Sequence, residues 1–201
     1  MSRFYPKFDK YIPSDVQGKK AERSYIAHFK VSATKATVAS TTGIHAAVTS
    51  TASPSVVTTG ITQPSVPRNI TATAGGTATD IKAIQVVIEG TNYAGETITE
   101  TLPAFTVDTA GTVTGSKAFK TITKITIPAH DGTGATTAIG FGEKLGLPYK
   151  LAHNTVLASY LDNTKESTAP VVTIDSANLE GNTIDLNSSL NSKVVDAYLI
   201  V

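Results

Sequence analysis

Apolar and polar residues alternate along most of the chain from residue 24 onward. In residues 25–31, the apolar Phe29 and Val31 occupy odd-numbered positions, whereas the polar His28 and Lys30 occupy even-numbered positions. Successive side chains of a β-strand point to opposite faces of a sheet, so a period of two indicates a strand with one buried face. Runs of β character cover residues 44–49, 55–61, 69–74, 81–90, 96–102, 102–107, 118–127, 136–141, 155–161, 170–175, 182–186 and 194–201. The pattern therefore predicts a long series of short strands.

The spacing of these runs predicts the fold class. Turn-forming clusters such as residues 74–80, 90–95 and 162–167 separate them. No segment between them keeps the period of an amphipathic helix, and threonine, a β-branched residue that suits sheets, is the commonest residue. We therefore expect an all-β protein, with an antiparallel β-sandwich or barrel-like domain of jelly-roll or immunoglobulin-like type over residues 24–201.

The first 23 residues differ from the rest of the chain. They contain six basic and three acidic residues, and their apolar positions keep no regular period. We interpret them as an extended N-terminal arm that either lies over its own domain or docks on a neighbouring subunit. Aromatic and arginine side chains are enriched in protein interfaces. The candidate partner-binding residues of the arm are Phe4, Tyr5, Phe8, Tyr11, Arg3, Lys7 and Lys10.

Charge composition narrows the choice of partner. Charged residues make up 16% of the chain, against a typical share of about 25%, and the net charge is +1. The arm's excess of three positive charges is small beside the roughly 6 to 10 phosphate contacts of a committed nucleic-acid binder. We expect no nucleic-acid partner. So few charges fit either a surface hidden in an assembly or a surface made polar by threonine and asparagine.

The absence of certain residues and segments excludes further classes. There are no cysteines, so disulfide frameworks, cysteine-based zinc sites and cysteine nucleophiles are excluded. No run approaches the roughly 20 apolar residues of a membrane span, and residues 1–13 lack the apolar core of a signal peptide. We therefore expect synthesis in a cytoplasm and no membrane partner.

The glycine-rich stretch at residues 130–148 has the composition of a phosphate-binding loop but not its spacing. Neither GxGxxG nor GxxxxGK[ST] occurs there. Gly146 and Pro148 also interrupt any helix whose N-terminus could face a phosphate. We expect a loop at Gly132 and Gly134, a short strand over residues 136–141, and a turn at Gly146, with no nucleotide cofactor.

No group of residues has the sequence spacing of a known catalytic or metal-binding motif. His130 and Asp131 are adjacent, but the other histidines lack metal-ligand spacing, so a turn in which Asp131 bonds its own backbone is the better interpretation. Glu96 and Glu100 would lie about 13 Å apart on one strand face, too far for a glycosidase pair, and are expected on a solvated face. No GxSxG motif occurs. We expect a protein that is not an enzyme and uses no cofactor or metal.

Residues 70–150 resemble a module found in structural proteins of tailed bacteriophages. The matching elements are a strand ending in GTN at residues 90–92, TITETL at residues 97–102, KAFKTIT at residues 117–123, and the GFGEKLGLP segment at residues 140–148. The resemblance implies a virion protein without catalytic residues, assembled in the host cytoplasm. Residues 24–62 and 152–201 would then contribute strands to a sheet system around this module.

The resemblance and the composition together favour a capsid decoration or cement protein that forms homo-oligomers. Its partners would be the major capsid protein or other virion proteins, which it would contact through the arm and its β surfaces. Two alternatives remain open: a tail or head-to-tail connector component, and a carbohydrate-binding module. A carbohydrate-binding module would require exposed aromatic side chains on the β domain. Most aromatic residues of that domain instead occupy the alternate strand positions that are expected to face the core.

Deletion of the last four residues tests the expected role of the final strand. Residues 194–201 are almost wholly apolar, so we expect them to pair inside a sheet or a subunit interface. Removing Tyr198, Leu199, Ile200 and Val201 should expose the apolar surface that they cover and give insoluble protein. The soluble fraction after expression measures this, and a soluble truncation that assembles normally would contradict it.

Overall fold

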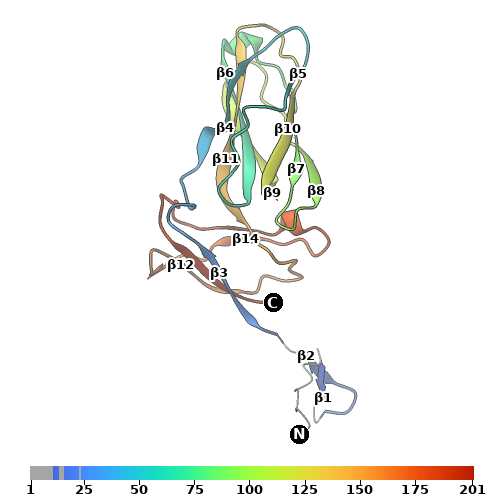
Figure 1. Cartoon of the computed structure of the whole chain (residues 1–201), viewed down its shortest axis with the longest axis vertical. Coiled ribbons are helices and arrows are strands. Elements are labelled where there is room, and N and C mark those ends of the chain that lie inside the picture. Colours follow the sequence, from blue (N-terminus) through green and yellow to red (C-terminus); the bar gives the residue numbers. More distant parts are fainter. Residues whose placement is uncertain (1–10, 14–15, 23) are drawn as a thin grey trace.

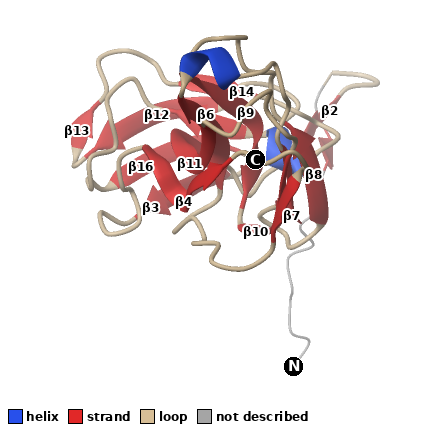
Figure 2. Cartoon of the chain, turned by 90° about the horizontal axis from the view of Figure 1, so that it is seen from above, coloured by secondary structure: helices blue, strands red, loops and turns tan. Residues whose placement is uncertain are grey.

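The computed structural model describes residues 11–13, 16–22 and 24–201. Every strand pair is antiparallel, and the described residues contain no α-helix, only two short 3₁₀ turns, η1 (Ala78–Asp80) and η2 (Leu179–Gly181). Figure 1 shows an elongated β-sheet body with a small hairpin beyond one end. Figure 2 shows the same strands from above. The expected all-β antiparallel fold is confirmed.

Three sheets form the body, and we name them by position. The central sheet has the order β14 (Val171–Thr173), β15 (Thr183–Asp185), β11 (Ala135–Gly146), β6 (Arg68–Gly76) and β9 (Gly111–Phe119), with β4 (Ser40–Thr49) also paired to β11. The facing sheet has the order β5 (Ser55–Val57), β10 (Thr121–Ile127), β7 (Val87–Thr91) and β8 (Thr97–Thr101). The lower sheet has the order β13 (Thr164–Lys165), β12 (Val156–Leu161), β16 (Val195–Ile200) and β3 (Ile26–Val31). A separate hairpin joins β1 (Tyr11–Pro13) to β2 (Lys20–Glu22).

Two hydrophobic cores stabilise the body. In the first core, Ile70 and Ile139 of the central sheet pack in one cluster with Ile88 and Ile125 of the facing sheet. In the second core, the lower end of the central sheet packs with Val195 and its neighbours in the lower sheet. Each fully buried side chain of this kind contributes roughly 1.5–3 kcal/mol to folding. The body therefore consists of a sandwich with a second packed layer at one end (Figure 1).

Strand β11 passes through both cores. Ile139 belongs to the first core and Leu145 to the second. Along its length β11 pairs with β6 on one edge, and with β4 and then β15 on the other. The expected loop at Gly132 and Gly134 and the strand over residues 136–141 are confirmed. The expected turn at Gly146 was wrong, because the strand continues from Ala135 to Gly146 and the glycines at 140, 142 and 146 lie inside it or at its end.

Gly140 is required by a close approach of β11 to β4. A Cβ atom at residue 140 would overlap the Ser40 carbonyl oxygen and would lie 2.7 Å from Thr41 Cα. Both are backbone atoms, which cannot move aside as a flexible side chain can. Gly140 therefore permits the close packing of β11 against β4.

A buried arginine lies where the two cores meet. Arg68 is fully buried, donates from Nη1 to the Thr37 carbonyl oxygen at 2.6 Å, and places its guanidinium 4.6 Å from the centre of the Phe141 ring. Burial lowers the pKa of Arg68 to about 10, and the nearby carboxylates of Glu143 and Asp185 oppose that shift. Arg68 therefore remains protonated at neutral pH and ties residues 37, 68 and 141 together.

Two strand predictions fail where the chain changes sheets. Residues 118–127 were expected to form one strand, but the chain leaves the central sheet after Phe119 and enters the facing sheet at Thr121. Residues 102–107 were expected to form a strand but are irregular. Pro103 has no backbone N–H to donate, and Leu102 and Phe105 are buried as side-chain anchors. β7 and β8 form a hairpin across the turn-forming cluster at residues 90–95, as the sequence of that cluster indicates.

The last strand lies inside the lower sheet, as predicted. β16 pairs with β12 on one side and with β3 on the other. Leu199 is fully buried, whereas Tyr198 and Val201 remain exposed, so the expectation that the whole terminal segment is buried was wrong for these two residues.

Substitution of Gly140 by alanine tests the close approach of β11 and β4. The added methyl group meets fixed backbone, so we expect Gly140→Ala to lower the free energy of unfolding by about 1–3 kcal/mol, the usual effect of overpacking. Gly111→Ala in β9 is the matched control, because no heavy atom lies within 4 Å of a Cβ atom there. Urea unfolding of both variants measures the difference, and equal stabilities would contradict this account.

Candidate functional site

The sequence-predicted arm residues lie mostly outside the described part of the chain. Phe4, Tyr5, Phe8, Arg3, Lys7 and Lys10 fall outside the described residues, and Tyr11 is described only as the first backbone position of β1. The hairpin pairs Tyr11 with Glu22 and Pro13 with Lys20. Among the described strands, β1 and β2 pair only with each other, and Figure 1 places them beyond the end of the body.

The arm leaves the body beside the C-terminus. Tyr25 donates its N–H to the Val201 carbonyl oxygen, and Val201 donates its N–H to the Tyr25 carbonyl oxygen, both at 2.9 Å. Tyr25 and Ile26 are strongly exposed there, at 58% and 69%. The chain is therefore fixed to the body from Tyr25 onward.

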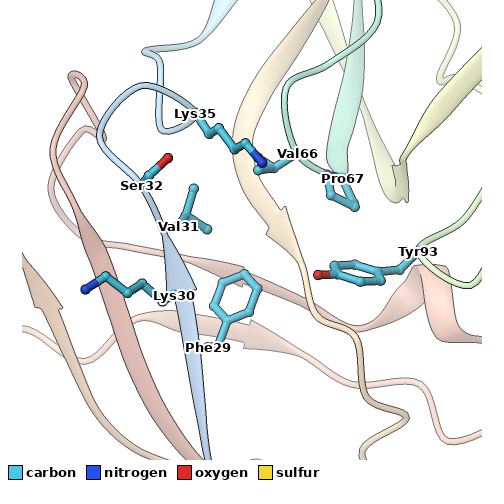
Figure 3. Close-up of a pocket in the computed structure, with 8 residues that line it drawn as sticks. All are labelled: Phe29, Lys30, Val31, Ser32, Lys35, Val66, Pro67 and Tyr93. Atoms are coloured by element: carbon cyan, nitrogen blue, oxygen red, sulfur yellow. The ribbon is translucent and has the colours of Figure 1, made fainter.

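An apolar groove runs beside β3, and we call it the β3 groove. It has a volume of about 380 Å³. Figure 3 shows Phe29 of β3 and Tyr93 of the β7–β8 turn facing each other across it, with Pro67 beside Tyr93 and Lys35 extending toward Val66. Lys30 points away from the groove. Apolar side chains with one ammonium group at the margin fit a segment of protein better than a polar small molecule.

β3 is also an edge strand. Among the described strands it pairs with β16 alone, through residues 26–31. An edge strand has backbone N–H and C=O groups that can pair with another extended chain. The β3 groove and the free edge of β3 are therefore one surface suited to protein contact.

The opposite face of β3 carries different chemistry. His28 and Lys30 project from the outer face of the lower sheet, where they meet Asp196 and Tyr198 of β16. The His28 and Tyr198 rings stack 4.7 Å apart with their planes 8° from parallel, and Tyr160 of β12 approaches Tyr198 edge-on at 6.1 Å. With Asn163 these residues line a concavity of about 460 Å³, which we call the tyrosine pocket.

Asp196 is the polar centre of the tyrosine pocket. Its side chain is only 12% exposed, and its Oδ1 lies 2.6 Å from His28 Nε2 and 3.8 Å from Lys30 Nζ. Within the described part of the chain both contacts use Oδ1, so Oδ2 is free to accept a hydrogen bond from a ligand. The Asp196 carboxylate and the Lys30 ammonium have opposite charges that largely offset each other within the pocket.

Sequence reasoning missed the tyrosine pocket because it placed most β-domain aromatics in the core. Tyr93 and Tyr198 are both 37% exposed. The alternation along β16 could have indicated the pocket. Val195, Ala197 and Leu199 are fully buried on one face of the strand, and Asp196 and Tyr198 lie on the other face. A carboxylate at the same parity as a tyrosine indicates the outer face of a sheet.

His130 and Asp131 have structural contacts that differ from those expected. His130 is buried; its Nδ1 accepts a hydrogen bond from the Lys82 N–H, and its Nε2 lies 3.0 Å from Thr137 Oγ1. Asp131 pairs with Lys82 Nζ at 3.1 Å and makes no bond to its own backbone, contrary to expectation. Asp80 Oδ2 accepts from the Gly134 N–H instead and holds the loop.

Glu100 is buried, so its expected place on a solvated face was wrong. It is 8% exposed, and its Oε1 accepts hydrogen bonds from the Ser116 N–H at 2.6 Å and from the Lys117 N–H at 3.2 Å. Glu96, just before β8, instead accepts from Asn92 Nδ2. Glu100 therefore binds the backbone of strand β9, whereas Glu96 contacts Asn92 in the β7–β8 turn.

The described residues contain neither a metal-binding cluster nor a membrane-spanning helix. No group of three or more histidine, aspartate or glutamate side chains in the described part of the chain could hold a metal ion. No helix there is long and apolar enough to span a bilayer.

Comparison with known proteins adds no relative. No protein family matches the chain, and neither the curated proteins nor the solved structures contain a match. The β3 groove and the tyrosine pocket therefore have to be interpreted from their own chemistry.

The burial of His130 should make the stability of the folded protein depend on pH. Burial lowers the pKa of His130, against the opposing charge of Asp131. Because the pKa is lower in the folded than in the unfolded state, the unfolded state binds more protons below about pH 6.5. The free energy of unfolding should therefore fall as pH drops from 7.5 toward 5.

A non-titrating variant isolates the contribution of His130. His130→Gln keeps an acceptor for the Lys82 N–H but cannot be protonated, so its stability should fall less over the same pH range. Thermal unfolding at pH 7.5, 6.5 and 5.5 measures both proteins. Parallel curves for the wild type and the variant would show that His130 has no part in the pH dependence.

Proposed function

We propose that this protein is a non-enzymatic structural component of a tailed-phage virion, most specifically a capsid decoration or cement protein. Its partners would be the major capsid protein or other virion proteins, and it would act as a homo-oligomer after assembly in the host cytoplasm. The observation that carries the proposal is the β1–β2 hairpin, which pairs only with itself among the described strands.

An isolated hairpin needs a partner surface. A two-stranded hairpin is at best marginally stable in water, because it buries little apolar area on its own. Figure 1 places this hairpin away from the body of its own chain. The surrounding segment contains Phe4, Tyr5, Phe8 and Tyr11, side chains of the type that anchors protein interfaces. Docking on a neighbouring protein would bury these aromatics and stabilise the hairpin.

The body has a second surface for protein contact. The β3 groove combines Phe29, Val66 and Tyr93 with the free edge of β3. An extended segment of a virion protein could pair with that edge and place alternate side chains in the groove. Repetition of both contacts across a symmetric shell would give high avidity from individually weak contacts.

The phage-like segment supports the same proposal. Its elements correspond to β6, the β7–β8 hairpin, the β9–β10 junction and β11. Most of the first hydrophobic core comes from these strands and the loops between them. The resemblance therefore covers one packed unit, to which the lower sheet and the arm are additions.

Substitution of the arm aromatics tests the proposal directly. The variant with Phe4, Tyr5, Phe8 and Tyr11 all changed to alanine should fold normally and bind its particle at least about 30-fold more weakly, the effect of losing one strong aromatic anchor. The matched control changes Arg3, Lys7 and Lys10 to glutamine and should mainly alter the salt dependence of binding. Cosedimentation with particles that lack this protein measures both variants.

The position in the particle separates the possible virion roles. Electron microscopy of intact particles should show the protein as a density repeated on the outer capsid lattice. A ring at one vertex would instead indicate a connector component, and a tube would indicate a tail component. Unchanged binding of the aromatic variant would show that the arm does not attach the protein.

A further inference from the structure

The tyrosine pocket differs from the β3 groove in chemistry, although β3 contributes to both. It is lined by His28, Lys30, Tyr160, Asn163, Asp196 and Tyr198, which include two aromatic phenols and no aliphatic side chain. Its volume of about 460 Å³ lies within the usual range of roughly 300–1,000 Å³ for small-molecule sites. Polar groups surround the two tyrosines on a concave surface, so this pocket fits a small polar ligand.

The backbone around the pocket holds its side chains in fixed positions. Tyr198 and Asp196 lie on β16, an inner strand of the lower sheet that is paired on both sides. Asn163 lies in a two-residue turn between β12 and β13, where Leu161 pairs with Thr164. Asp162 and Asn163 have φ angles of 53° and 62°, as the tight primed turn of a hairpin requires. The pocket is therefore built largely in advance of ligand binding.

The opposite charges of Asp196 and Lys30 largely offset each other, so the pocket has little net attraction for an anion or a cation. The carboxylate of Asp196 in its floor would repel a phosphate or carboxylate group. The Lys30 ammonium, 3.8 Å from that carboxylate, would in turn repel a cation. A neutral ligand therefore fits the pocket best, one that donates to Asp196 Oδ2 and accepts from the Asn163 amide or Lys30.

Sugar hydroxyl groups satisfy those requirements together. Each hydroxyl both donates and accepts hydrogen bonds, and the apolar C–H face of a pyranose ring can pack against the parts of Tyr160 and Tyr198 that line the pocket. From this combination we propose that the tyrosine pocket binds a neutral saccharide, with Tyr198 and Tyr160 contacting the ring and Asp196 and Asn163 orienting its hydroxyls. This proposal is independent of the virion role, because it uses neither the arm nor the β3 groove.

Glycan binding by the full-length protein tests the proposal. An array carrying neutral and acidic oligosaccharides should give neutral hits, and the strongest neutral hit is then titrated calorimetrically. Tyr198→Ala should weaken that binding about tenfold or more, because it removes an aromatic contact of about 1.4 kcal/mol. Asp196→Asn, which keeps the shape of the side chain but removes its charge, should weaken binding by a similar factor.

Two further variants make the test specific. Tyr93→Ala is the matched control, since Tyr93 has the same 37% exposure as Tyr198 but lines the β3 groove, and it should leave saccharide binding unchanged. Asn163→Gly retains the left-handed turn and removes only the amide, so it should weaken binding without disturbing the hairpin.

Three outcomes would overturn the proposal: no neutral oligosaccharide bound, hits confined to acidic glycans, or equal weakening by Tyr93→Ala and Tyr198→Ala. Particle binding by the same variants is measured in parallel. Loss of saccharide binding with particle binding retained would leave the virion proposal intact, so failure of one proposal is distinguishable from failure of the other.

Discussion

The whole body depends on the continuity of strand β11 through two hydrophobic cores. Its upper half packs Ile139 into the sandwich, and its lower end places Leu145 against the lower sheet. This continuity requires β4 to approach the β11 backbone at Gly140, where no side chain fits. If β11 ended where its glycines suggest turns, the second core would lose its link to the first. Buried Arg68, which reaches both Thr37 and Phe141, reinforces the same junction with a charged group.

The position of β3 follows from that arrangement and gives the protein two surfaces. The second core fixes Phe29 and Val31 on the inner side of the strand, where Phe29 also borders the β3 groove. The alternation of the strand then places His28 and Lys30 on the outer face beside Asp196 and Tyr198. One side is apolar and next to a free sheet edge, whereas the other is aromatic, polar and concave. The first suits a protein partner and the second a small polar ligand.

Much of the fold was predictable because strand alternation is a local property. The inward positions of β3 and the pairing of the final strand followed from residue parity and apolar character alone. The predictions were wrong where the same residue pattern continues although the chain passes into another sheet or becomes buried. Residues 118–127 keep one β pattern, yet they serve two sheets, because Lys120 lies at a corner that no periodicity marks. Glu100 was misplaced because a carboxylate looks solvated until the backbone N–H groups of Ser116 and Lys117 are seen to surround it.

The sequence by itself determined the all-β class, the antiparallel strand pattern, the lack of nucleotide-loop spacing and the distinct composition of the arm. These depend on side-chain periodicity and residue type, which are readable along the chain. Tertiary structure alone decided that the glycines of β11 serve close packing and that β3 is a sheet edge beside a groove. It also decided that Tyr160, Asn163, Asp196 and Tyr198 share one pocket with His28. His28 and Tyr198 are 170 positions apart in the chain, and only the pairing of β3 with β16 brings their rings into contact.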